Sequence, residues 1–172
     1  MNPRDRNKRK KQEDRMDCTF MTEEGFFNFR VGAVITDGRR VLMATNPHEN
    51  REFYYSVGGR VRFNESLEEA LLRELKEETG LCCEIDRLYA IHENFFFDGE
   101  GVPVHEISAY FLIKKNKELL SIENGHLTDK GPDDEYLIWI DLEHDTDKVI
   151  YPEFFRDLDL TDSGIKHYLT RD

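Results

Sequence analysis

Six glutamates fall within residues 65–78, and three of them, Glu74, Glu77 and Glu78, have a spacing that could do chemistry. On an α-helix these three carboxylates project within an arc of about 100°. Each pair of carboxylates about 5 Å apart repels by roughly 3 kcal/mol at an effective dielectric of 20, so the group must take up protons, turn into water or bind cations. Oxygen ligands select a hard cation, which predicts Mg²⁺ or Mn²⁺.

The alternative is that these glutamates cover the solvated face of a helix. The leucine stripe overlaps the carboxylate stripe at one edge, and Glu78 falls between Leu67 and Leu71 around the helix axis. A solvated glutamate would be an odd choice at that angle. Glutamate-rich helices are nevertheless common on protein surfaces, so the helix alone leaves both readings open.

The helix that carries the glutamates has start and stop signals of its own. Ser66 and Glu69 have the spacing of a capping box, which predicts the N-terminus of the helix. Gly80 stands where a C-terminal cap is expected. We therefore expect one helix from about residue 66 to residue 80.

Strand-like runs surround this helix. They are expected at residues 26–36, 41–45, 53–57, 82–97, 103–115 and 136–142, with a short helix at 152–158 and an amphipathic C-terminal segment after it. The Asp37-Gly38 pair between the first two runs is typical of a hairpin turn. This order favours the α/β class, with a mixed sheet and helices packed on it.

Gly59, Glu65 and the run RELKEETGL at 73–81 are spaced as in the signature of the Nudix hydrolase family, which this chain resembles at every fixed position. The resemblance implies a Nudix-type α/β/α sandwich with a mixed β-sheet. It covers residues 16–172 as one domain and leaves residues 1–15 outside as a flexible basic tail. It also implies an enzyme that uses Mg²⁺ or Mn²⁺ to cleave a P–O–P bond of a nucleoside diphosphate linked to another group.

The resemblance assigns roles to individual residues. Glu74, Glu77 and Glu78 match the metal-binding carboxylates of the family, and the backbone carbonyl of Gly59 matches a further ligand. Arg73 matches a residue that orients the glutamates, although a plain surface salt bridge is its alternative. One of the glutamates could accept the proton of the attacking water.

Further acids outside these positions are candidates for the same chemistry. Some Nudix enzymes use an additional glutamate as ligand or base, and Glu106, inside an apolar strand, is our candidate for that role; strand-edge solvation is the alternative. Glu65 is either a metal ligand or a buried structural acid. Glu135 is a weaker candidate, and His105 is expected to face away from Glu106 as a surface histidine.

Four residues are candidate substrate contacts. Arg60 and Arg62 alternate beside the glycine pair and could meet phosphates, with outward salt bridges as the alternative. Tyr55 and Phe96 could provide a surface on which a base stacks, with core packing as the alternative. The expected substrate is a small nucleotide-type diphosphate, either a nucleotide, a dinucleoside polyphosphate or a nucleotide sugar.

Composition limits the remaining function classes. The formal net charge of −12 weighs against broad nucleic-acid binding, although seven basic and three acidic residues at 4–15 leave an RNA 5′ end as a possible substrate. No apolar run is long enough to span a membrane, so a cytoplasmic location is expected. The three cysteines predict no disulfide. A homodimer, a non-catalytic nucleotide sensor and a purely structural protein are kept as further hypotheses.

Overall fold

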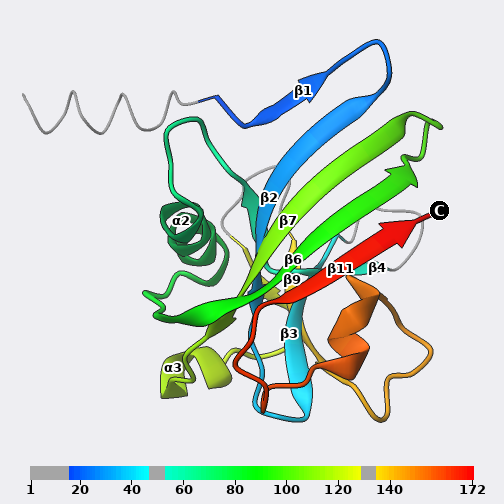
Figure 1. The fold of residues 1–172 in the computed structure, drawn as a ribbon. Coiled ribbons are helices and arrows are strands. Elements are labelled where there is room, and N and C mark those ends of the chain that lie inside the picture. Colours follow the sequence, from blue (N-terminus) through cyan, green and yellow to red (C-terminus); the bar gives the residue numbers. More distant parts are fainter. Residues whose placement is uncertain (1–15, 47–52, 129–134) are drawn as a thin grey trace, which may run out of the picture.

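The computed structural model describes residues 16–46, 53–128 and 135–172 (Figure 1), so the predicted basic tail at 1–15 lies outside the described residues. Its larger sheet has the strand order β1-β2-β7-β6-β11, and β5 pairs with β2 as well. These strands are β1 (Thr19–Met21), β2 (Phe26–Val34), β5 (Gly58–Arg60), β6 (Ile85–Phe97), β7 (Pro103–Ile113) and β11 (Lys166–Arg171). The sheet is mixed, as predicted, because β2 and β7 run parallel whereas β6 and β7 run antiparallel.

A second sheet has the order β10-β4-β3-β9-β8. Its strands are β10 (Val149–Tyr151), β4 (Phe53–Ser56), β3 (Arg40–Thr45), β9 (Tyr136–Asp141) and β8 (His126–Leu127). The Asp37-Gly38 turn lies between the two sheets: Leu42 N–H donates to the carbonyl of Ile35 at 2.9 Å, as in a hairpin, and β3 then continues against β4 and β9.

Helix α2 (Leu67–Thr79) carries the glutamates, and its two ends match the signals in the sequence. The Ser66 hydroxyl accepts from Glu69 N–H at 3.2 Å, and the Glu69 carboxylate accepts from Ser66 N–H at 2.9 Å, which completes the capping box. Gly80 ends the helix with a left-handed φ of 71°. Sequence and structure agree here because these signals are local.

The remaining helical segments are short. Helix α3 (Lys117–Leu120) follows β7, and the predicted helix at 152–158 is the 3₁₀ helix η2 (Glu153–Asp157). The amphipathic C-terminal segment forms strand β11, parallel to β6. Cys18, Cys82 and Cys83 are free, as predicted. Among the described residues, no helix is long and apolar enough to cross a bilayer.

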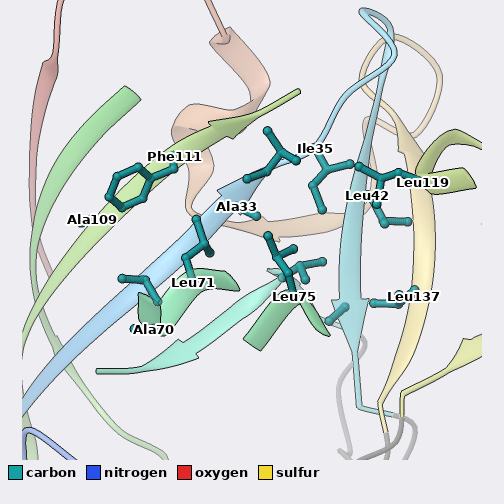
Figure 2. Packing of buried hydrophobic residues seen from close by; sticks show 14 of the residues in the cluster. Ala33, Ile35, Leu42, Ala70, Leu71, Leu75, Ala109, Phe111, Leu119 and Leu137 are labelled. Atoms are coloured by element: carbon teal, nitrogen blue, oxygen red, sulfur yellow. The ribbon is translucent and has the colours of Figure 1, made fainter. Parts of the chain in front are cut away.

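The two faces of the larger sheet pack against different elements. Val31, Ala33, Ala109 and Phe111 face α2, where Ala70, Leu71 and Leu75 complete one core cluster (Figure 2). Val34 and Tyr110 belong to the other cluster, together with Phe155 of η2. Side chains alternate along a strand, so the odd-numbered residues of β2 and β7 face α2 and the even-numbered residues face the other way.

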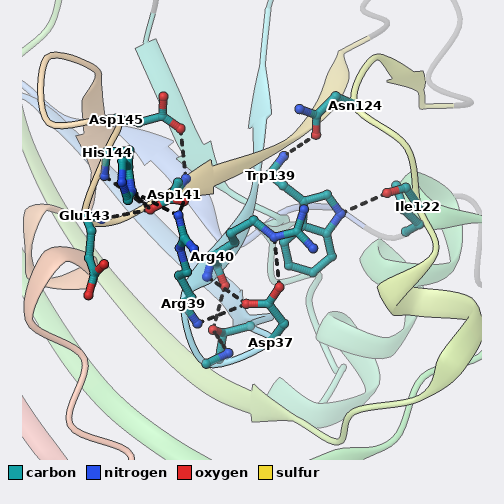
Figure 3. Close-up of polar contacts among 12 residues, drawn as sticks. Asp37, Arg39, Arg40, Ile122, Asn124, Trp139, Asp141, Glu143, His144 and Asp145 are labelled. Carbon is teal, nitrogen blue, oxygen red and sulfur yellow. Dashed lines mark hydrogen bonds and ion pairs between the residues drawn. The ribbon is translucent and has the colours of Figure 1, made fainter.

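A polar network fixes the turn before β3 to the end of β9 (Figure 3). The Asp37 carboxylate accepts from the backbone N–H groups of Arg39 and Arg40 and from the Arg40 side chain at 2.8 Å. The Arg40 guanidinium lies 5.0 Å from the ring centroid of Trp139, whose indole N–H donates to the carbonyl of Ile122 at 2.9 Å. The network therefore holds the second sheet together at the end where it meets β2.

Candidate active site

Glu74 lies directly against the backbone of Gly59. A Cβ atom built on Gly59 would fall 2.3 Å from the Glu74 carboxyl carbon and 2.5 Å from each of its oxygens. Glycine is therefore required for the close approach of the carboxylate to β5. The contact leaves Glu74 only 8% exposed.

Glu78 is buried more deeply, with 1% exposure, and its Oε2 accepts a hydrogen bond from Gly58 N–H at 3.1 Å. A carboxylate at such a site is costly to bury without compensating partners. The solvated-face alternative is therefore wrong for Glu78. Glu77 differs, because its side chain remains 42% exposed and its carboxylate can be reached from solvent.

Arg73 links the acidic residues to one another. Its guanidinium contacts the carboxylate of Glu74, lies 3.5 Å from Glu77 Oε2, and donates to the backbone carbonyl of Arg60 at 3.0 Å. Burial disfavours the cation, but the hydrogen bonds from Arg73 to Glu65 and Glu74 outweigh it and raise the pKa of Arg73. Arg73 is thus a fixed cation among the carboxylates rather than a plain surface salt bridge.

Glu65 holds Arg73 from the other side. Its oxygens accept from Arg73 Nε at 2.9 Å and Arg73 Nη2 at 3.1 Å, and Oε2 also accepts from Arg62 N–H at 3.0 Å. Burial would raise the pKa of Glu65, but these hydrogen bonds lower it. Both carboxylate oxygens of Glu65 are hydrogen-bonded and its side chain is only 3% exposed. These contacts favour the interpretation of Glu65 as a buried structural acid over that of a metal ligand.

The local charge favours a divalent cation. The carboxylates of Glu65, Glu74 and Glu77 contact the guanidinium of Arg73, and that of Glu78 is buried against Gly58 on the same side of the helix end; four carboxylates and one guanidinium leave three formal negative charges when all are ionised. Carboxylate oxygens and the Gly59 carbonyl form a hard donor set that fits Mg²⁺ or Mn²⁺. Across the described ranges no three acidic, histidine or cysteine side chains form a preassembled ion site.

Comparison with known proteins decides the family. The sequence profile of the NUDIX domain matches residues 27–154, which is most of the chain. The chain belongs to the Nudix family. A nudix hydrolase of Caenorhabditis elegans is 32% identical over 79 residues, and that match spans 43% of this chain and 22% of the relative.

Solved structures show the same fold. The MutT protein of Bacillus halodurans has a TM-score of 0.58 at 18% identity, with 83% of this chain and 90% of that chain covered. A MutT NUDIX hydrolase of Burkholderia pseudomallei has a TM-score of 0.52 at 24% identity, with 68% and 84% covered. At these identities the likeness shows a shared Nudix fold.

Glu106 lies apart from the glutamates of the Nudix helix. Glu106 on β7 pairs with Asn28 on β2. Its carboxylate accepts hydrogen bonds from Asn28 Nδ2 at 2.7 Å and from Ser108 Oγ at 3.2 Å. Asn28 and Glu106 are even-numbered residues of β2 and β7, so both lie on the face of the sheet opposite α2. Sequence analysis missed Asn28, although an amide inside the apolar run FFNFRVGAV was a signal.

The candidate substrate contacts lie in different places. Arg60 is exposed on β5, with its guanidinium 3.8 Å from Asp17, and Arg62 forms an isolated bridge with Asp17. Tyr55, on β4, has its ring 6.1 Å from that of Tyr151. The structure therefore brings Arg60 and Arg62 to the segment between β5 and α2, residues 61–66, which we call the Nudix loop, and puts Tyr55 in the second sheet.

Three further candidates lie outside the Nudix loop. Phe96 lines a cavity at the β6–β7 end of the larger sheet. His105 is exposed on the face opposite Glu106, as predicted, but it stacks on Phe95 at 4.4 Å. Glu135 directly precedes β9, and its backbone N–H donates to the Thr128 hydroxyl at 3.0 Å.

Proposed function

We propose that this Nudix protein uses Mg²⁺ or Mn²⁺ to hydrolyse a P–O–P bond of a small nucleotide-type diphosphate. The observation that carries the proposal is the burial of Glu74 and Glu78 against the backbone of Gly58 and Gly59. Burying two carboxylates beside each other destabilises a fold unless a cation compensates them. Arg73 compensates only part of this charge, so the arrangement is suited to holding a divalent ion.

The chemistry follows from the charges of the reactants. A diphosphate bridge is anionic and repels hydroxide, so the site must neutralise phosphate and make a water more acidic. A divalent ion bound at these oxygens supplies both effects. The chain's own residues keep Glu74 and Glu78 fixed through the glycine backbone, while Arg73 fixes the orientation of Glu74.

The more exposed Glu77 can meet solvent, and one glutamate of the trio accepts the proton of the attacking water. Arg60 and Arg62, beside this loop, are proposed to meet the phosphates. Glu106 stays our candidate for an additional acid, and Asn28 and Ser108 hold its carboxylate in place.

A substrate panel tests the proposal. Nucleoside triphosphates, dinucleoside polyphosphates and nucleotide sugars are incubated with Mg²⁺ or Mn²⁺, and release of phosphate or nucleoside monophosphate is measured. Glu78→Gln should abolish turnover of any accepted substrate. Glu68→Gln is the matched control, because Glu68 is an exposed glutamate of the same helix.

Two results would speak against hydrolysis, and a third would speak against the role of Glu78. Tight nucleotide binding without turnover would favour the sensor hypothesis. Absence of both binding and turnover, with stability that metal does not change, would favour a structural protein. Equal turnover by Glu78→Gln and Glu68→Gln would show that the buried glutamate has no part in the reaction.

A further inference from the structure

A series of hydrogen bonds crosses three strands on the face of the larger sheet opposite α2. The Thr19 hydroxyl on β1 donates to Asn28 Oδ1 on β2 at 2.8 Å, and Asn28 Nδ2 donates to Glu106 Oε2 on β7 at 2.7 Å. Ser108 Oγ donates to the other carboxylate oxygen at 3.2 Å. The bond from Thr19 fixes the amide of Asn28, so that its amino group is directed at Glu106.

The carboxylate of Glu106 keeps acceptor capacity after these bonds are made. Within the described part of the chain, its hydrogen-bond partners are two neutral donors, one on each oxygen, and no cation contacts it. A carboxylate has about four acceptor sites, two on each oxygen. The side chains of Asn28 and Ser108 are buried, whereas Glu106 is only partly buried. Glu106 therefore offers two adjacent acceptor sites to a ligand.

Two arginines extend this face toward the proposed hydrolytic site. Arg30 on β2 pairs with Ser108 of β7 and with Arg60 of β5, so both arginines lie on the same face as Glu106. With strands about 4.8 Å apart and residues about 3.3 Å apart along each strand, the Cα atoms of Glu106 and Arg60 are about 12 Å apart. A nucleoside diphosphate can span this length, with its phosphates at the arginines and its nucleoside at Glu106.

The proposed hydrolytic site meets this face at the free edge of β5. Among the described strands, β5 pairs with β2 alone. Gly58 N–H donates to Glu78, and the Arg60 carbonyl accepts from Arg73, so these backbone groups point away from β2. Side chains of α2 thus reach the open edge of the sheet, which borders both faces. Phosphates bound at this edge can meet the glutamates while the nucleoside lies on the other face.

We propose that Glu106 recognises the nucleoside part of the substrate by accepting from two adjacent neutral donors. Asn28 and Thr19 are positioning residues for this carboxylate, and Arg30 contacts phosphate. The inference rests on the hydrolysis proposed above, and it gives our candidate acid a task in substrate recognition. Two parts of a nucleotide carry such a donor pair: the 2′ and 3′ hydroxyls of a ribose, and the ring N–H and amino group of guanine.

Binding of three diphosphate analogues to the full chain with Mg²⁺ tests the proposal by calorimetry. Guanosine α,β-methylene diphosphate, whose P–C–P bridge is not hydrolysed, is compared with its 2′,3′-dideoxy form and with the inosine analogue, which lacks the amino group. Wild type should bind one altered ligand at least about tenfold more weakly, the size of a lost hydrogen bond to a charged group. That ligand identifies ribose or base as the donor pair. Equal affinity for all three would overturn the proposal.

Two variants test the series of hydrogen bonds. Glu106→Gln should remove most of this preference, because the new amide group donates where the carboxylate accepted. Thr19→Val should reduce the preference several-fold, because the amide of Asn28 is then free to turn. Thr170→Val is the matched control: Thr170 lies in the same row of the sheet, but its hydroxyl bonds to His92, so the preference should stay.

The phosphate contact and the fold are tested separately. Arg30→Gln should weaken all three ligands to a similar extent and keep the preference. Methylenediphosphonate, which has no nucleoside, should bind Glu106→Gln as it binds wild type. Loss of that binding in Glu106→Gln would assign Glu106 to the fold and overturn the proposal, as would an unchanged preference in this variant.

These ligands also separate recognition from hydrolysis, because no bond in them is cleaved. A protein that turns over no substrate of the panel but discriminates through Glu106 would keep the recognition site and reject hydrolysis alone. Turnover of a panel substrate without discrimination among the three analogues would reject recognition alone.

Discussion

The guanidinium of Arg73 is held by two hydrogen bonds to the carboxylate of Glu65, eight positions earlier in the chain, at 2.9 and 3.1 Å. The pair connects the loop after β5 to the helix that carries the glutamates. Because Arg73 also contacts Glu74, a change in Glu65 reaches the proposed metal site through a single side chain.

Glu65→Gln should lower kcat about 10–100-fold, as expected when a group that orients a metal ligand is lost. The glutamine keeps the size of the side chain but removes the charge that fixes Arg73. Turnover of the accepted substrate and the Mn²⁺ concentration for half-maximal rate are measured together, with Glu68→Gln alongside. Unchanged values for both quantities would show that Glu65 serves stability alone.

Gly58 and Gly59 should respond differently to alanine. At Gly59 the new Cβ meets only the end of the flexible Glu74 side chain, so the fold should survive while displacement of the carboxylate lowers kcat roughly 100-fold. At Gly58, where φ is +147°, the Cβ would lie 2.2 Å from the carbonyl oxygen of Val31, so the protein itself should be destabilised.

Urea unfolding and steady-state rates of the two variants separate these effects. Gly99→Ala is the control, because nothing lies within 4 Å of its Cβ position. An active Gly59→Ala variant would mean that the position of Glu74 against β5 is unimportant for the reaction.

The Asp37 turn predicts a loss of stability in acid. Burial raises the pKa of Asp37, but backbone hydrogen bonds from Arg40 and Arg39 and the Arg40 side chain outweigh it and lower the pKa to about 2. The carboxylate therefore stabilises the fold fully above its unfolded pKa of about 4, and this contribution disappears as the pH falls from about 4 to about 2.

Asp37→Asn measures this contribution. At pH 6 it should be less stable than wild type by about 1 kcal/mol, allowing for solvent screening, and the difference should vanish near pH 2. Urea unfolding followed by the fluorescence of Trp139, the one tryptophan, gives both values. A difference that is the same at both pH values would assign the effect to packing rather than to charge.

The basic tail leads to a prediction about RNA. It joins the described chain at Met16, whose carbonyl accepts from Phe63 N–H at 2.7 Å in the loop before α2. If an RNA 5′ end is a substrate, deletion of residues 1–15 should lower turnover of 5′-triphosphate RNA several-fold and leave mononucleotide turnover unchanged. Equal effects on both substrates would reject the RNA hypothesis.

An element of this fold can be predicted from the sequence when its signals lie within the element itself, and not when it depends on pairing with distant residues. The capping box at Ser66 and the C-cap at Gly80 are local, and α2 is where they place it. Strand β11 pairs with β6 across more than 70 residues, and no local pattern distinguishes its amphipathic segment from a helix. The division into two sheets likewise depends on pairing between distant strands.

The site shows the same limit. The spacing of Glu74, Glu77 and Glu78 predicts one group on one helix; the structure has all three on α2, with Glu74 and Glu78 buried and Glu77 exposed. The spacing cannot show how Glu106 relates to that group, because this depends on the register of β2 and β7. Whether Glu65 is a metal ligand or a structural acid likewise depends on its contacts with Arg73, which the sequence does not show.

Binding of Mn²⁺ tests the central claim, that Glu74, Glu77 and Glu78 hold a divalent ion, most directly. Free Mn²⁺ is measured by electron paramagnetic resonance while the ion is added to wild type, Glu78→Gln and Glu68→Gln. The account predicts that Glu78→Gln weakens Mn²⁺ binding at least tenfold, by loss of one charged ligand, and that Glu68→Gln binds as wild type does. Equal binding by all three proteins would contradict it.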